Sequence, residues 1–247
     1  MSNRLSGKRI LITGAVDNIG KESVASFVGE GASVVIADID AAKGAVTAKE
    51  LGTGFVEVDV RDEASVERMV TRAVGELGGL DGLCQLAAIQ IAGSLETLSA
   101  EDWDLSFAVN VRGQFFGAKH AIGALRASGN GSIVNMASVA GKIGAGVYGA
   151  TKAAVMSLTR SLATELAKDN VRANAVCPGW TDTAFNNPTI NAMGGKEAHA
   201  ALVRRTVPLA RQATPSEIAP ILVYLLSDES TYMTGQSISI DGGLTMT

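Results

Sequence analysis

Short apolar runs, many of them rich in β-branched residues, alternate along this chain with longer segments whose apolar residues recur at helical intervals. Several runs are apolar at consecutive positions, which is typical of parallel strands covered by helices on both faces. The expected strands are residues 9–13, 33–38, 55–60, 80–88, 132–138, 171–178 and 237–242. This alternation predicts an α/β fold in which a doubly wound parallel sheet lies between two layers of helices.

Length and composition fit one globular domain. The chain has 247 residues, of which 47% are apolar and 19% are charged, and it shows no repeat, low-complexity tract or linker. We therefore expect a single domain that spans residues 1–247. The formal net charge of −4 gives no electrostatic reason to expect nucleic acid or an anionic membrane as a partner.

The other bulk features favour the cytoplasm. The start, MSNRLSGKRI, lacks the apolar core of a secretory signal, and no apolar run approaches the roughly 20 residues that span a membrane. Cys84 and Cys177 lie in apolar, strand-like stretches and are expected to be buried thiols. Two cysteines and the isolated His120 and His199 have no metal-ligand spacing, so no metal site is expected.

Residues 9–23, RILITGAVDNIGKES, have the order strand, glycine-containing turn and helix. In such a turn Gly14 suits the tight bend and Gly20 lets the helix start pack closely, while backbone N–H groups and the helix dipole attract an anion. A purely structural βα turn also uses glycines, so this motif alone is a weak signal for a dinucleotide.

Asp38 stands at the end of the second expected strand. A carboxylate at this point can accept hydrogen bonds from both hydroxyls of an adenosine ribose, and it repels a 2′-phosphate. Asp38 therefore favours NAD over NADP as the cofactor. The other interpretation, a helix N-cap, is filled as easily by Asp40.

Tyr148 and Lys152 are four residues apart in a segment with helical character, GVYGATKAAV. Four residues are about one helical turn, so both side chains leave the same face. A tyrosine with its ordinary pKa near ~10 is too protonated to act as a base, but a neighbouring ammonium stabilises the phenolate. The pair is therefore expected to remove a proton from a bound alcohol. The alternative is a surface pair in which the lysine covers an aromatic ring.

Further motifs extend this pattern along the chain. Besides Asp38, they are TGAVDNIG (13–20), VDVRD (58–62), NVRG (110–113), NMAS (135–138), YGATK (148–152) and CPGWTDT (177–183). In their order and spacing they resemble the motifs of the short-chain dehydrogenase/reductase family over essentially the full length. The resemblance implies a Rossmann-type fold with a seven-stranded parallel sheet. It also implies an NAD-dependent oxidoreductase that acts on a secondary alcohol or ketone, commonly as a homotetramer.

The same resemblance implies a catalytic tetrad of Asn110, Ser138, Tyr148 and Lys152. Lys152 would also bind the nicotinamide ribose, Ser138 would bond the substrate oxygen, and Asn110 would hold a water of a proton relay. The residues implied to bind the cofactor are Gly14, Asp17, Asn18, Ile19, Gly20, Asp38, Asp59, Val60, Ala87, Tyr148, Lys152, Pro178, Gly179, Thr181 and Thr183.

Three departures from the family pattern affect these positions. Asn18 replaces the middle glycine of the phosphate loop; the turn can survive because Asn tolerates positive φ, and the cofactor is expected to approach less closely or through the Asn amide. QLAA (85–88) replaces the family's NNAG, and Leu86 cannot make the hydrogen bonds by which those asparagines hold the sheet centre. The ten residues from Ser138 to Tyr148 are fewer than the family usually has.

Two alternative functions stay open. One is a 3-oxoacyl-thioester reductase that uses NADPH, against which Asp38 argues, and the other is an NAD-binding protein with impaired catalysis. Substrate contacts are expected from Gln90, Ile91, the 139–147 loop and a substrate loop at about residues 180–207. That loop begins at Trp180 and contains Phe185, Met193, His199, Arg204 and Arg205, a mixed set that suits an apolar ketone or a polyol.

Overall fold

Seven strands form one parallel sheet in the computed structural model, which describes residues 3–246. The order across the sheet is β3-β2-β1-β4-β5-β6-β7. The strands are β1 (Arg9–Thr13), β2 (Ser33–Asp38), β3 (Gly54–Glu57), β4 (Gly82–Gln85), β5 (Ser132–Met136), β6 (Arg172–Pro178) and β7 (Ser237–Ile240). The predicted doubly wound sheet is confirmed. Its order reverses between β1 and β4, and folds of this kind bind ligands at the carboxyl ends of the strands around such a point.

Each predicted strand is present, but β3, β4, β5 and β7 end earlier than their apolar runs. Val58, Leu86 and Ala137 follow the last paired residues of β3, β4 and β5, and all three line a cavity described below. The apolar character of these residues therefore serves the cavity wall rather than the strand ladder.

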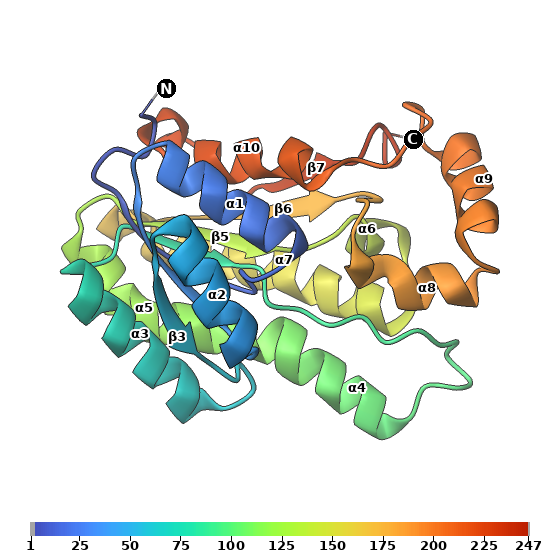
Figure 1. Ribbon diagram of the computed structural model, residues 1–247, viewed down its shortest axis with the longest axis horizontal. Helices are drawn as coiled ribbons and strands as arrows, with labels where there is room; N and C mark the ends of the chain where they lie inside the picture. Colours follow the sequence, from blue (N-terminus) through green and yellow to red (C-terminus); the bar gives the residue numbers. More distant parts are fainter. Residues whose placement is uncertain (1–2, 247) are drawn as a thin grey trace.

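Helices cover both faces of the sheet (Figure 1). Ile10 and Ile12 of β1 pack into a core with Phe27 of the first helix, whereas the intervening Leu11 packs with Met69 in a second core on the opposite face. The first core includes α1 (Asn18–Gly29), α2 (Ala41–Leu51) and α10 (Pro215–Leu226), and the second includes α3 (Glu63–Leu77), α5 (Gly113–Ala127) and α7 (Gly146–Leu166). Because side chains alternate along a strand, strands β1 to β6 contribute to both cores, whereas β7 contributes Ile238 and Ile240 to the first core.

The other helical segments are short and lie mostly at the ends of the sheet. They are α4 (Ala100–Phe107), the π-helical η1 (Ala108–Arg112), α6 (Ala140–Ile143), η2 (Ala167–Asp169), η3 (Ala184–Asn186), α8 (Asn187–Ala192), α9 (Lys196–Thr206) and η4 (Asp228–Ser230). Figure 1 shows α8 and α9 in orange at the end of the sheet toward which β6 points. Among residues 3–246, no helix combines the length and apolarity needed to cross a membrane.

Helix starts follow the expected chemistry. Glu217 accepts a hydrogen bond from the backbone N–H of Thr214 at 2.8 Å, which confirms the capping interaction predicted at the start of α10. Asp40, not Asp38, is the N-cap of α2 and accepts from the N–H of Lys43 at 2.9 Å. The side chain of Asp38 is therefore available to the cavity at the end of β2.

At the centre of the sheet, Gln85 takes over the holding role that the sequence leaves without an asparagine. Its buried Nε2 donates to the carbonyl oxygen of Gln114 at 3.0 Å and to Oδ1 of Asn135 at 2.9 Å. Nδ2 of Asn135 donates in turn to Oγ1 of Thr159 at 2.9 Å. Leu86 makes no such bond, as expected, but the longer Gln85 side chain joins β4 to α5 and β5.

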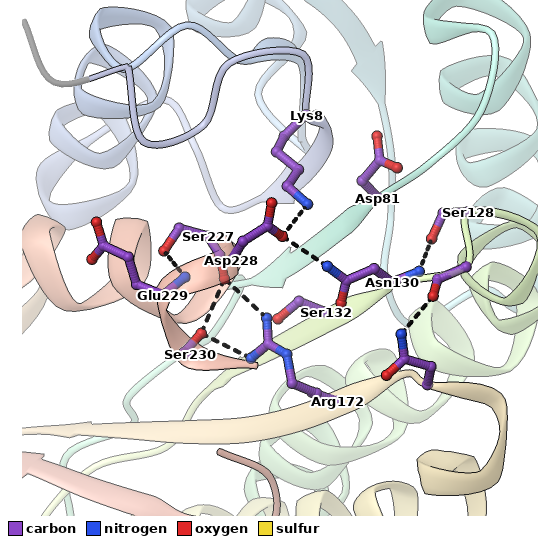
Figure 2. A network of polar contacts seen from close by, with 12 residues as sticks. Lys8, Asp81, Ser128, Asn130, Ser132, Arg172, Ser227, Asp228, Glu229 and Ser230 are labelled. Carbon is purple, nitrogen blue, oxygen red and sulfur yellow. Dashed lines mark hydrogen bonds and ion pairs between the residues drawn. The ribbon is translucent and has the colours of Figure 1, made fainter. Parts of the chain in front are cut away.

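The amino-terminal end of β6 is tied to the end of α10 by a buried arginine (Figure 2). Nη1 of Arg172 donates to Oγ of Ser230 at 2.9 Å, and Nη2 donates to the carbonyl oxygens of Leu225 and Ser227 at 3.0 and 3.3 Å. A cation at this place also interacts favourably with the carboxyl end of the α10 dipole. We call Arg172, Leu225, Ser227 and Ser230 the Arg172 cluster.

Candidate active site

A cavity of about 1260 Å³ lies where the strands end. Its walls come from the segments that follow β1, β2, β3, β4, β5 and β6, together with the start of α7 and parts of η3, α8 and α9. Every residue that the sequence predicted to bind the cofactor lines this cavity. Of the predicted tetrad, Ser138, Tyr148 and Lys152 line it as well, and Asn110 does not.

The turn after β1 is tight and leaves the start of α1 open toward the cavity. Gly14 has φ +70°, and a Cβ on it would lie 2.6 Å from the backbone nitrogen of Ala87, so glycine is required. The N-cap residue, Asp17, makes no side-chain capping bond, and Asn18, Ile19 and Gly20 of the first turn line the cavity. Uncapped N–H groups at a helix N-terminus form a binding site for phosphate.

Asn18 holds the middle of this turn with φ 52°, which confirms that asparagine can replace glycine there. Its Oδ1 accepts a hydrogen bond of 3.3 Å from the backbone N–H of Ala184 in η3. The amide thus connects the phosphate turn to the segment that leads into α8, and its expected effect on the approach of the cofactor stays a prediction.

Charged groups gather at the cavity end formed by the segments after β1, β2 and β3. Lys43 pairs with Asp17 at 2.7 Å and with Asp40 at 3.9 Å. Asp59 accepts two hydrogen bonds from Nε and one, of 2.6 Å, from Nη2 of Arg61. This guanidinium lowers the pKa of Asp59. We call this the adenosine end, and its charged lining residues are Asp17, Asp38, Asp40, Lys43, Asp59 and Arg61.

Asp40, Lys43 and Arg61 are the charged lining residues that were not predicted for this cavity. Lys43 and Arg61 are exposed and held by carboxylates, and only the place of Arg61 within the VDVRD motif could have indicated its position.

Tyr148 and Lys152 lie one turn apart on α7, as predicted. Nζ of Lys152 is 5.5 Å from the centre of the Tyr148 ring. It donates a 2.8 Å hydrogen bond to the carbonyl oxygen of Met136 at the end of β5. The Ser138 side chain is close enough to Tyr148 to act on its pKa as a hydrogen-bond partner. The alternative of a surface pair is wrong, because Lys152 is fully buried.

The protonation of this pair differs from the expectation. Burial raises the pKa of Tyr148, and the hydrogen bond with Ser138 only partly opposes this. Burial also lowers the pKa of Lys152 to about 7. Removal from water disfavours the charged form of both groups. The predicted lowering of the Tyr148 pKa by the lysine is therefore not seen in this structure.

The shortened loop between Ser138 and Tyr148 brings the two side chains together nonetheless. Residues 140–143 form the short helix α6, and Gly144 and Gly146 then take φ of 72° and 58° before α7 continues. Few other residues adopt such angles without strain. The glycines thus allow fewer residues to close the gap.

Asn110 is fully buried in η1, and its side chain is occupied by protein groups. Its Oδ1 accepts from the N–H of Ile89 at 2.8 Å, and its Nδ2 donates to the carbonyl oxygen of Ile89 at 2.9 Å and to Oγ1 of Thr151 at 3.1 Å. The side chain therefore anchors the segment after β4 to α7. The predicted role of Asn110, to hold a water of a proton relay as a member of the tetrad, stays a prediction, because its side chain is bonded to the backbone of Ile89 and to Thr151.

The predicted substrate loop is divided between cavity and surface. Trp180, Phe185 and Met193 line the cavity. The buried ring of His199 packs edge-on against Trp180, with 4.5 Å between centroids, and does not line the cavity. Arg204 and Arg205 are exposed and do not line it either.

The residues present fit a dinucleotide with a nicotinamide ring. The fit rests on the Gly14 turn, which a Cβ would fill, and on the uncapped start of α1. Across the same cavity, a serine and a tyrosine lie beside a buried amine. Such a combination is what a nicotinamide-dependent oxidoreductase requires.

Residues 14–245 match the family model described as enoyl-(acyl carrier protein) reductase. Two relatives from Thermotoga maritima cover nearly the whole chain. One, an uncharacterized oxidoreductase, is 39% identical over 97% of this chain and 98% of its own. The other, 3-oxoacyl-acyl-carrier-protein reductase FabG, is 38% identical over 98% of this chain and 99% of its own. The structure of a short-chain type dehydrogenase/reductase from Mycobacterium ulcerans superposes with a TM-score of 0.91, at 30% identity, over 98% of this chain and 90% of the other. The chain belongs to the short-chain dehydrogenase/reductase family and is an oxidoreductase that acts on alcohols and ketones.

Proposed function

We propose that the protein transfers a hydride between NAD(H) and a secondary alcohol or its ketone, with Tyr148 as general acid and base. One observation carries the proposal: the side chains of Ser138, Tyr148 and Lys152 line the same cavity as the adenosine end. The bound nicotinamide would supply the hydride acceptor or donor and, when oxidised, a positive charge beside the phenol.

The protein groups handle the proton and the substrate oxygen. Ser138 would donate a hydrogen bond to this oxygen, and Tyr148 would take the hydroxyl proton during oxidation and return it during reduction. The Lys152 amine would orient a ribose hydroxyl and hold positive charge near the phenol. The residues that would hold the dinucleotide are those lining the Gly14 turn, Asp38, the Asp59–Val60 segment, Ala87 and the stretch from Pro178 to Thr183.

The charges at the adenosine end support NAD over NADP. Four carboxylates and two cations line it, which leaves two negative charges in excess. Both cations are already engaged, Lys43 by Asp17 and Arg61 by Asp59. A 2′-phosphate would meet uncompensated negative charge here, whereas the carboxylate of Asp38 can accept from the two ribose hydroxyls.

Initial rates of alcohol oxidation with NAD⁺ and NADP⁺ test this proposal. We expect a clear preference for NAD⁺, and Asp38→Ala should reduce that preference at least about tenfold. Tyr148→Phe should lower turnover at least about 100-fold while calorimetry still detects cofactor binding. Tyr232→Phe removes the hydroxyl of a fully exposed tyrosine and is the matched control. Turnover that survives Tyr148→Phe would overturn the assigned role.

The same experiment separates the alternatives. A 3-oxoacyl-thioester reductase is favoured by the similarity to FabG and would prefer NADPH and a thioester substrate. A binding protein with impaired catalysis would bind the cofactor and turn over no alcohol.

We also propose a single-domain chain that assembles as a homotetramer in the cytoplasm. Trp103 of α4 and Phe115 of α5 are 46% and 45% exposed, and large exposed apolar side chains are typical of subunit contacts. Cys84 and Cys177 are buried free thiols, which fits a reducing compartment. Light scattering of the purified protein tests the tetramer.

A further inference from the structure

Charge is distributed unevenly along the cavity. All charged residues that line the cavity, except Lys152, belong to the adenosine end. We call the rest of the wall, formed by lining residues within 89–109, 138–148 and 180–206, the substrate half. Among the described residues that line the substrate half, none carries a charged side chain. The uncharged wall surrounds the place where Ser138 and Tyr148 meet the substrate.

The wall of the substrate half is largely apolar. Apolar side chains from all three of these ranges line it, and they include Ile89, Ile143, Trp180, Phe185, Met193 and Leu202. Phe185 lies against the catalytic tyrosine, with 6.1 Å between the centroids of the two rings. A substrate placed next to Tyr148 is therefore in contact with aromatic and aliphatic surface.

The basic residues of the substrate loop add no positive charge to the substrate half. Arg204 and Arg205 are on the last turn of α9 and face solvent. His199 is buried behind Trp180, and burial lowers its pKa, which favours the neutral imidazole. None of these three side chains offers the substrate half a positive charge that could pair with an anionic group.

One polar group in this wall lacks a partner. Oε1 of Gln90 is buried and accepts no hydrogen bond from the residues that the structure describes. Gln90 directly follows Ile89, whose backbone is bonded to Asn110, so the backbone that carries this amide is held in place. A buried acceptor without a donor is unfavourable, and because Gln90 lines the cavity, a small rotation of its amide would bring Oε1 to a ligand hydroxyl that satisfies it.

We propose that the substrate is an uncharged, largely apolar secondary alcohol or ketone that carries an additional hydroxyl group, which donates to Oε1 of Gln90. This inference rests on the proposed function and names the substrate class for the same site. It excludes substrates with a carboxylate, sulfonate or phosphate near the reacting carbon, because burying an unpaired anion against this wall is costly.

A pair of probes that differ only in charge tests the substrate class. Methyl 3-hydroxybutyrate and 3-hydroxybutyrate share the same secondary alcohol, but only the second is an anion. We expect kcat/KM for the ester to exceed that for the acid at least about 100-fold. Calorimetry with the oxidised cofactor and methyl acetoacetate or acetoacetate, which cannot react, should show binding of the ester alone. Equal or tighter binding of the acid would overturn the inference.

A second pair of probes tests the Gln90 contact. The ratio of kcat/KM for trans-cyclohexane-1,2-diol to that for cyclohexanol should fall about tenfold in Gln90→Leu, as expected for one lost hydrogen bond. Gln236→Leu makes the same change at an exposed position outside the cavity and is the control. Gln90→Arg should raise kcat/KM for 3-hydroxybutyrate by supplying the missing cation. An unchanged ratio in Gln90→Leu would show that Gln90 does not bind the additional hydroxyl group.

Different results would overturn the proposed function and the proposed substrate class. If the wild-type protein oxidises none of these probes with either cofactor, the proposed function fails, and the substrate class fails with it. If it oxidises the acid as well as the ester in a Tyr148-dependent manner, the oxidoreductase function stands and only the uncharged substrate class is wrong.

Discussion

The amine of Lys152 is bonded to the carbonyl oxygen of Met136 at 2.8 Å while it faces the ring of Tyr148 at 5.5 Å. The carbonyl oxygen of Met136 also accepts from Nε2 of Gln114 at 3.3 Å, so the last residue of β5 holds two donors from two helices. The position of the amine is therefore set by the sheet, and the tyrosine is placed relative to it by one turn of α7.

Lys152→Met should change how stability depends on pH. The pKa of Lys152 falls from 10.5 to about 7 on folding, so between these values the unfolded chain binds more protons than the folded protein. The loss of folding stability that the buried lysine causes in the wild-type protein is full below pH 7 and disappears as pH rises toward 10.5. The stability of the variant relative to wild type should thus fall by about 1.4 kcal/mol per pH unit between pH 7.5 and 9.5. Urea unfolding at several pH values measures this, and Lys168→Met in η2 is the control. Parallel stability curves for wild type and Lys152→Met would contradict it.

Two substitutions at Asn18 should distinguish its role in the turn from its contact with η3. Asn18→Gly tolerates φ 52° and should leave the free energy of unfolding within about 0.5 kcal/mol of wild type. Asn18→Val should cost about 1–2 kcal/mol because a β-branched residue is strained at this angle. Hydrogen exchange at the Ala184 amide should become faster in the glycine variant, since its acceptor is lost. If exchange at Ala184 stays as slow as in wild type, the bond does not hold this segment.

Gly117 of α5 and Gln85 should be strongly coupled. A Cβ on Gly117 would collide with Oε1 of Gln85. Replacing a helical glycine by alanine normally stabilises by about 0.5–1 kcal/mol. We expect Gly117→Ala to destabilise the wild-type protein and to stabilise the Gln85→Ala variant, with a coupling energy of at least about 1 kcal/mol.

The matched control for this cycle lies on the same helix. A Cβ on Gly123 would meet nothing within 4 Å, so Gly123→Ala should stabilise both backgrounds equally. Chemical unfolding of the wild-type protein, the three single variants and the two double variants supplies the energies. An additive result for Gln85 and Gly117 would mean that the core relaxes around the added methyl group.

Arg172→Met should weaken the fold without touching the site. The substitution removes the donors to Leu225, Ser227 and Ser230 and should lower the free energy of unfolding by about 2–3 kcal/mol. Arg126→Met breaks the exposed pair with Asp169 and should cost less than about 1 kcal/mol. Cofactor affinity measured by calorimetry should change less than about twofold in both variants. A larger loss of affinity in Arg172→Met would show that the two ends of β6 are energetically linked.

Much of the fold follows from local patterns in the sequence. The strand positions are predictable because buried parallel strands need consecutive apolar residues, and the cofactor end because a tight βα turn needs Gly14. The early ends of β3, β4 and β5 were not predicted, since an apolar residue that lines a cavity looks the same in sequence as one in a strand. The π-helical turn at Asn110 was also missed, because no local pattern announces it.

The site was predictable in its members but not in its energetics. The Tyr148–Lys152 spacing indicates one helical face, yet the direction of both pKa shifts depends on burial, which arises from segments far away in the sequence. The partners of Lys43 and Arg61 likewise depend on how loops meet after folding. The uncharged substrate half became visible only when the exposed side of α9 was known.

Strand β6 begins at Arg172 and ends at Pro178, so one continuous strand has the Arg172 cluster at its first residue and the cavity wall at its last. Substitutions after Pro178 can therefore change which substrates the cavity accepts without weakening the Arg172 cluster at the other end of the strand. Exchange of the segment from Trp180 to Thr206 should alter substrate selectivity and leave the midpoint of thermal unfolding unchanged. Because stability and selectivity depend on opposite ends of one strand, the fold can accept new substrate-binding segments.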